Sequence, residues 1–177
     1  MKLLCICGAS GVGKTTLVEQ LIPLLRAQGL RVSVIKHAHK RFDIDQPGKD
    51  SHRHRSAGAT EVLVASDQRL ALLREYDQPG LPSIHALIAE LSPCDWVLVE
   101  GYKHAALPKL EVWRAALGQQ ALYPDDPFVV ALATDAPAAL PEATARPVFD
   151  MADVAALADW LLAGNARFDY QAPEDHG

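Results

Sequence analysis

The residues best suited to chemistry form a glycine-rich run near the N-terminus. The run is Gly8-Ala9-Ser10-Gly11-Val12-Gly13-Lys14-Thr15, which matches the spacing G-x-x-x-x-G-K-[ST] in full. In such a loop the glycines let successive backbone N–H groups face a phosphate chain. The lysine adds a positive charge at the β and γ phosphates, and the threonine hydroxyl ligates Mg²⁺. The run therefore predicts a phosphate-binding loop (P-loop, residues 8–15) for a nucleoside triphosphate with Mg²⁺.

The phosphate contacts are expected from one continuous segment that runs into the following helix. Its members are Ala9, Ser10, Gly11, Val12, Gly13, Lys14, Thr15 and Thr16. Lys14 is also a candidate catalytic residue, and Thr15 is a candidate metal ligand.

The elements around this run have the order that a P-loop needs. Leu3 to Cys7 is an apolar stretch typical of a buried strand, and Lys14 to Gln28 has the leucine spacing of a helix. Pro23 predicts a kink near Glu19 or a shorter helix. Arg31 to Lys36 is a second strand, which completes a crossover of the kind that builds parallel sheets.

The rest of the chain continues this α/β pattern. Strands are expected at residues 96–99, 109–113 and 128–133, an antiparallel hairpin at 60–65 and 70–74, and helices at 50–57, 82–91 and from Asp150 onward. The predicted fold is an α/β P-loop NTPase, with a mostly parallel sheet flanked by helices and an added hairpin. We expect one compact domain over residues 1–164 and a flexible tail over 165–177.

A P-loop needs a second carboxylate to hold or orient the metal. Asp95 and Glu100 flank the expected strand at 96–99, about 16 Å apart at ~3.3 Å per residue, so only one of them can reach the metal. Ligands collect at the carboxyl ends of parallel strands, which favours Glu100. A solvated turn acid is the alternative interpretation of Glu100.

The loop after the second strand carries further acidic residues. Asp43, Asp45 and Asp50 lie in this segment, where a carboxylate can bind a water of Mg²⁺ or position an attacking water. Asp45 is the candidate for both a catalytic and a metal role. An ordinary polar loop is the alternative.

Asp135 follows the expected strand at 128–133. A carboxylate at that position can accept hydrogen bonds from the N1–H and N2 amine of guanine, a pair of donors that adenine does not offer on the same edge. Asp135 is therefore a candidate for binding the base, and a plain turn aspartate is the alternative.

Composition limits the partners. The net charge is −5, which argues against binding of nucleic acid or an anionic membrane by the whole surface, although residues 36–55 carry six basic and three acidic side chains. The apolar N-terminal stretch ends at Gly8, too short for a signal peptide or a membrane span. Three cysteines suit a reducing compartment, so we expect a cytoplasmic protein.

Four segments carry a resemblance to a known family. They are the P-loop, VIKHAHKRFDIDQPGKDSHRHRSAGA at 34–59, LVEGYK at 98–103 and ATD at 133–135. Together they resemble the molybdopterin-guanine dinucleotide biosynthesis protein B family (MobB), over about residues 1–163. The chain lacks the usual N-K-x-D guanine signature.

This resemblance implies a dimeric GTP-binding protein with weak GTPase activity. It implies that the protein assists a molybdenum cofactor guanylyltransferase (MobA-like), which attaches GMP to molybdopterin. By the same likeness Lys14, Thr15 and Glu100 keep their phosphate and metal roles, and Asp135 gains its guanine role. The hairpin at 60–74 is a candidate dimer contact because exposed strand edges pair readily with a second copy.

Two other functions use the same residues. A small-molecule kinase would transfer the γ-phosphate itself with a base such as Asp45, and would form a phosphorylated acceptor without any partner. A binding module without catalysis would only hold the nucleotide.

Overall fold

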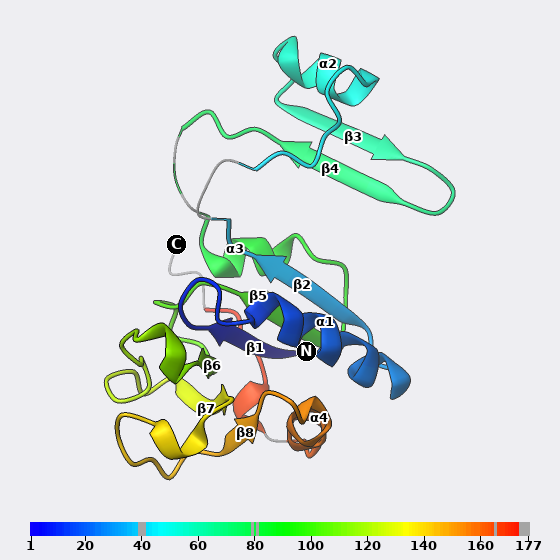
Figure 1. Cartoon of the computed structure of the whole chain (residues 1–177). Coiled ribbons are helices and arrows are strands. Elements are labelled where there is room, and N and C mark those ends of the chain that lie inside the picture. Colours follow the sequence, from blue (N-terminus) through cyan, green and yellow to red (C-terminus); the bar gives the residue numbers. More distant parts are fainter. Residues whose placement is uncertain (39–41, 79, 81, 165, 174–177) are drawn as a thin grey trace. The chain divides into compact units, whose positions relative to one another are not determined.

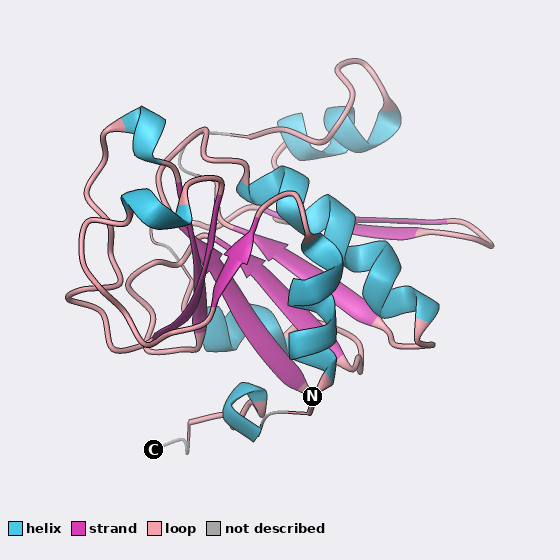
Figure 2. Ribbon diagram, turned by 60° about the horizontal axis from the view of Figure 1, so that its bottom comes forward, coloured by secondary structure: helices cyan, strands magenta, loops and turns pink. Residues whose placement is uncertain are grey.

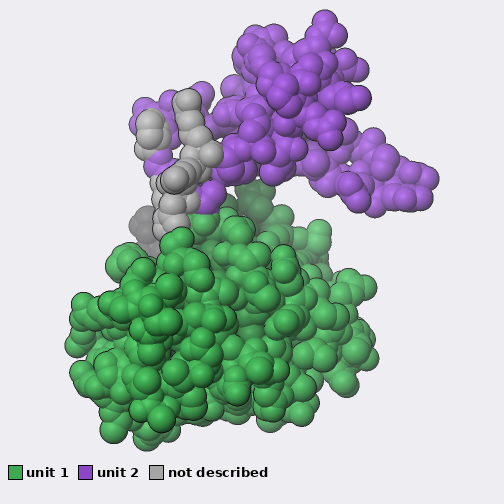
Figure 3. Space-filling model, in the orientation of Figure 1, with its two compact units in different colours: residues 1–37, 83–177 green, residues 38–82 purple. Residues whose placement is uncertain are grey.

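The structure is a computed structural model that describes residues 1–38, 42–78, 80, 82–164 and 166–173. The chain divides into two compact units, unit 1 with residues 1–37 and 83–177, and unit 2 with residues 38–82 (Figure 3). The sequence predicts one compact domain and does not anticipate this division. The domain limits of 1–164 and 165–177 stay a prediction.

Unit 1 is built on a six-stranded sheet with the order β2-β5-β1-β6-β7-β8, in which every pair of neighbours is parallel (Figure 1). The strands are β1 Lys2–Cys7, β2 Val32–Lys36, β5 Trp96–Glu100, β6 Lys109–Trp113, β7 Val129–Thr134 and β8 Val148–Asp150. The carboxyl ends of parallel strands meet at one edge, and this edge is where a ligand site is expected.

Helices cover both faces of this sheet (Figure 2). The helices of unit 1 are α1 Lys14–Ala27, α3 Ile84–Ala89 and α4 Val154–Leu162, with short 3₁₀ turns η1 Ala115–Leu117, η2 Pro137–Ala139 and η3 Ala166–Phe168. Leu4 and Ile6 of β1 face α1 and α4, whereas Leu3 and Cys5 face α3. This alternation explains why β1 is apolar from Leu3 to Cys7, as strands buried on both faces are.

The two cysteines of β1 are core residues, as the apolar stretch from Leu3 to Cys7 predicts. Cys5 and Cys7 are 0% and 1% exposed, and burial raises the pKa of each thiol to about 12. They act as small apolar side chains.

Two local expectations from the sequence are wrong. Asp150 ends the short strand β8, and α4 instead begins after Asp153, whose carboxylate accepts the Ala156 N–H. The α3 helix begins after Ser83, whose hydroxyl caps it, and not at Pro82. The α1 helix continues through Pro23 to Ala27, and the kink near Glu19 stays a prediction.

The segment expected as a flexible tail packs on unit 1 through Phe168. This side chain is 1% exposed, and its ring lies 5.5 Å from that of Trp96 and 5.3 Å from that of Trp160. The Tyr170 N–H donates to the Met1 carbonyl oxygen at 3.0 Å. Residues 165 and 174–177 of the expected tail lie outside the described residues.

Unit 2 contains α2 Asp50–Ser56 and the antiparallel pair β3 Glu61–Ala65 and β4 Leu70–Arg74. The predicted hairpin is therefore confirmed, with Leu63 opposite Leu72 and Ala65 opposite Leu70. Asp50 is the first residue of α2, while Lys49 stands at the capping position. Among the described residues of both units, no helix has the length and apolar character to cross a membrane.

Candidate nucleotide site

The P-loop joins the carboxyl end of β1 to the first turn of α1. Gly13 stands at the helix N-cap with φ of 102°, a left-handed conformation that favours glycine. Glycine brings no side chain to cap the helix, and the first turn carries no acidic residue. The first N–H groups of α1 and the positive end of its dipole are thus free to attract an anion.

Gly8 fits against the neighbouring strand β6 with no room for a side chain. Its φ is 127°, and a Cβ atom there would lie 2.2 Å from the Val112 carbonyl oxygen. Gly11 also has positive φ, at 81°, but a Cβ atom there would meet nothing within 4 Å. Gly8 therefore sets how closely the loop approaches the sheet, whereas Gly11 meets only a conformational demand.

Lys14 points its ammonium group back over the loop. Its Nζ donates to the carbonyl oxygens of Ala9 at 2.6 Å and Gly8 at 3.0 Å. Burial lowers the pKa of Lys14 from its ordinary value, and the negative charge of Glu100 opposes this shift. The charge is therefore held at the concave side of the P-loop, where the sequence predicts phosphate.

Thr15 and Glu100 meet, as the choice of Glu100 over Asp95 requires. The Thr15 hydroxyl donates to Glu100 Oε1 at 2.8 Å, and the Glu100 side chain is 12% exposed. Asp95 lies at the other end of β5 and accepts the Arg31 N–H at 2.6 Å. A hydroxyl beside a carboxylate offers oxygen ligands, which Mg²⁺ prefers, so the residues present fit the metal.

Asp135 borders a cavity of about 290 Å³ next to the start of α1. The cavity is lined by Gly13, Thr16, Leu17, Gln20, Arg114, Asp135, Asp150, Met151 and Ala152. It adjoins the P-loop at Gly13, and Thr16 brings the segment predicted to bind phosphate into its wall. A group bound at the P-loop can therefore extend into a pocket that contains the Asp135 carboxylate.

Arg114 joins this pocket to the P-loop. Its Nε donates to the Val12 carbonyl oxygen at 2.9 Å, and its NH1 donates to Asp135 Oδ2 at 2.9 Å. Both side chains of the ion pair are about 40% exposed, at 38% and 43%. Arg114 therefore fixes the position of the Asp135 carboxylate relative to the P-loop. The ion pair adds only modestly to stability because both side chains are partly solvated.

Asp45 belongs to unit 2, where its carboxylate has partners. Oδ1 accepts the Ser51 hydroxyl at 2.7 Å and the Gln46 N–H at 3.1 Å, and Oδ2 lies 3.5 Å from Arg55 Nε. The side chain is 5% exposed. These contacts stabilise the start of α2, and the catalytic and metal roles of Asp45 stay predictions.

The sequence analysis overlooked Arg114 and Lys36. Each lies at the carboxyl end of a strand, Arg114 just after β6 and Lys36 as the last residue of β2. The rule that selected Glu100 and Asp135 applies to both positions, so the signal was present. Met151 and Asp150 could not be found in this way because β8 itself was missed.

A family model described as molybdopterin guanine dinucleotide synthesis protein B (MobB) matches residues 3–135. The chain belongs to this family. The molybdopterin-guanine dinucleotide biosynthesis adapter protein of Escherichia coli is 40% identical over 166 residues, covering 90% of this chain and 91% of the relative. The protein of the same description from Haemophilus influenzae is 39% identical over 159 residues, covering 90% and 86%.

Solved structures of MobB proteins share the fold. The crystal structure of a MobB homologue from Bacillus stearothermophilus has 29% identity and a TM-score of 0.65, covering 92% of this chain and 97% of that one. The Bacillus subtilis MobB structure has 22% identity and a TM-score of 0.72, covering 97% and 100%. With the parallel sheet and hairpin described above, these similarities confirm the predicted fold class.

Substitution of the two loop glycines separates steric from conformational demands. We expect Gly11→Ala to lower the free energy of unfolding by about 1–2 kcal/mol, because alanine is strained in a left-handed conformation. In Gly8→Ala the new methyl group also overlaps with the Val112 carbonyl. We therefore expect Gly8→Ala to lower the free energy of unfolding by at least ~2 kcal/mol more than Gly11→Ala does. Urea unfolding followed by tryptophan fluorescence measures both, since all three tryptophans lie in unit 1. Equal losses of stability in the two variants would show that β6 does not restrict the side chain at position 8.

Proposed function

We propose that this chain is a GTP-binding adapter with weak GTPase activity that assists formation of molybdopterin-guanine dinucleotide. The observation that supports this most is the continuity between the P-loop and the pocket that contains Asp135. Family membership supports the pathway, since both relatives described above are adapter proteins of molybdopterin-guanine dinucleotide biosynthesis. The expected partners are molybdopterin and the guanylyltransferase that attaches GMP to it.

The pocket chemistry favours guanine. Guanine presents two adjacent donors, N1–H and the N2 amine, and a carboxylate accepts from both. Adenine places an acceptor at its N1, which a carboxylate repels. Asp135 is held at the pocket by Arg114 and stays 43% exposed, so it is accessible to a base whose phosphates lie at the P-loop.

Mg²⁺ would be held by Thr15 with Glu100 nearby, and would neutralise charge on the phosphates. Weak hydrolysis agrees with the surroundings of Glu100. Its Oε1 accepts the Thr15 hydroxyl and lies 3.2 Å from the Lys36 ammonium. A carboxylate held by these partners serves binding better than it serves as a base for water. The cytoplasmic location stays part of the proposal.

Exchange of one carboxylate tests the guanine assignment. We expect the protein to bind GTP with Mg²⁺ at least ~100-fold more tightly than ATP, because a site built for two donors rejects a base that lacks them. Asp135→Asn should lower the affinity for GTP by about 30-fold or more, because each hydrogen bond to a charged group contributes ~1.5–3 kcal/mol. The affinity for ATP should change by less than about threefold. Titration calorimetry measures both.

The matched control is Asp125→Asn, at an exposed aspartate in the loop between β6 and β7. It should leave both affinities unchanged. Equal binding of GTP and ATP by the unaltered protein would contradict the guanine assignment, as would an Asp135→Asn variant that keeps the full GTP preference of the unaltered protein.

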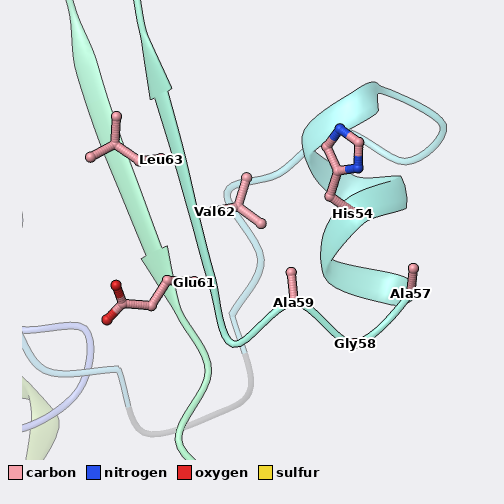
Figure 4. Close-up of a pocket in the computed structure, with 7 residues that line it drawn as sticks. All are labelled: His54, Ala57, Gly58, Ala59, Glu61, Val62 and Leu63. Atoms are coloured by element: carbon pink, nitrogen blue, oxygen red, sulfur yellow. The ribbon is translucent and has the colours of Figure 1, made fainter.

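We also propose that the protein forms a homodimer through the hairpin of unit 2. Figure 4 shows Val62 and Leu63 pointing to opposite sides of β3, with Val62 toward α2. The face opposite α2 carries Leu63, Leu70 and Leu72, which are 59%, 64% and 39% exposed. Such a face, on a sheet whose two strands are both edges, suits an identical hairpin as its partner.

Charge on this face should prevent dimerisation. In the double variant Leu63→Glu, Leu70→Glu, dimerisation would bury two carboxylates in the expected contact. We therefore expect this variant to be monomeric in sedimentation equilibrium at concentrations where the unaltered protein is dimeric. Leu117→Glu is the control, at a leucine of unit 1 that is 42% exposed. A double variant that stays dimeric would place the dimer contact elsewhere.

A further inference from the structure

Lys36 lies beside the two side chains that would serve the metal. It is the last residue of β2, and its Nζ lies 3.2 Å from Thr15 Oγ1 and 3.2 Å from Glu100 Oε1. Its side chain is 56% exposed, so the ammonium can shift toward a ligand. So far Lys36 serves only as a partner of Glu100, with no role toward the nucleotide.

The charges around the P-loop are mainly positive once Lys36 is counted. Lys14 and Lys36 face the site together with the first N–H groups of α1, against the one carboxylate of Glu100 in this cluster of described side chains. Like charges that face one site repel each other. An anion between them would relieve this repulsion.

The location of Lys36 points to one end of the phosphate chain. Thr15 would hold Mg²⁺ at the site, and the ion would neutralise charge at the β and γ phosphates. A cation that hydrogen-bonds to the same hydroxyl is therefore within reach of the terminal phosphate. Lys36 comes from β2, whereas Lys14 comes from the P-loop itself, so the two cations reach the site from different elements.

We propose that Lys36 binds the terminal phosphate of the nucleotide and makes the site prefer a triphosphate to a diphosphate. This inference rests on the proposed function, because it requires that nucleotide binds at the P-loop. A role limited to holding Thr15 and Glu100 in place is the alternative. That role would contribute little to nucleotide affinity, since exposed ion pairs are weak. It would also affect the binding of the triphosphate and of the diphosphate equally.

The test compares the affinities of GTP and GDP at one fixed Mg²⁺ concentration. Lys36→Met keeps the length of the side chain and removes its charge, so we expect GTP affinity to fall about 10- to 100-fold while GDP affinity changes less than about threefold. Lys36→Arg should retain most of the preference for GTP. Lys49→Met, at an exposed lysine of unit 2, is the control and should change neither affinity. Thermal unfolding of each variant checks the fold.

The outcomes separate this inference from the proposed function. An equal loss for GTP and GDP in Lys36→Met, or no loss for either, would overturn the role of Lys36 while GTP binding by the unaltered protein stands. An unaltered protein that binds neither nucleotide would overturn the proposed function, and the role of Lys36 with it.

Discussion

The parallel pairing of β1 with β5 is the constraint on which the site depends. In this register Ile6 lies opposite Glu100, so the carboxylate at the end of β5 meets the chain where β1 gives way to the P-loop. Thr15, in the first turn of α1, can then donate to Glu100 at 2.8 Å. A shift of one residue would turn Glu100 toward the opposite face of the sheet, and the oxygen pair that fits Mg²⁺ would be lost.

The same constraint brings the other candidate residues together. Lys36, Arg114 and Asp135 follow or end three further parallel strands, so all lie at one edge of the sheet although they are far apart in sequence. Arg114 connects two parts of the site, since it contacts both the Val12 carbonyl and the Asp135 carboxylate. The P-loop and the pocket that contains Asp135 are thereby linked through one side chain.

The sequence predicts the local parts of this structure well, because their signals are local. The P-loop, the strand before it, the helix after it and the hairpin each follow from the spacing of nearby residues. The strand β8 was missed because it has three residues, and Asp150 at its end resembles a helix cap. The packing of Phe168 against Trp96 could not be predicted, because it depends on contacts between residues far apart in sequence. The hydrogen bond between Asp45 and Ser51 likewise depends on how the loop folds. Arg114 and Lys36 stand at strand ends that the sequence marks, but their contacts with Asp135 and Glu100 depend on the order of the strands.

The central claim is that nucleotide bound at the P-loop is what the chain contributes to guanylation of molybdopterin. The most direct measurement is the yield of guanine dinucleotide from molybdopterin, GTP, Mg²⁺ and the guanylyltransferase, with the unaltered chain or with Lys14→Ala. The unaltered chain should raise the yield, and Lys14→Ala should not, because it lacks the charge that faces the phosphates. Equal stimulation by both proteins would contradict the account.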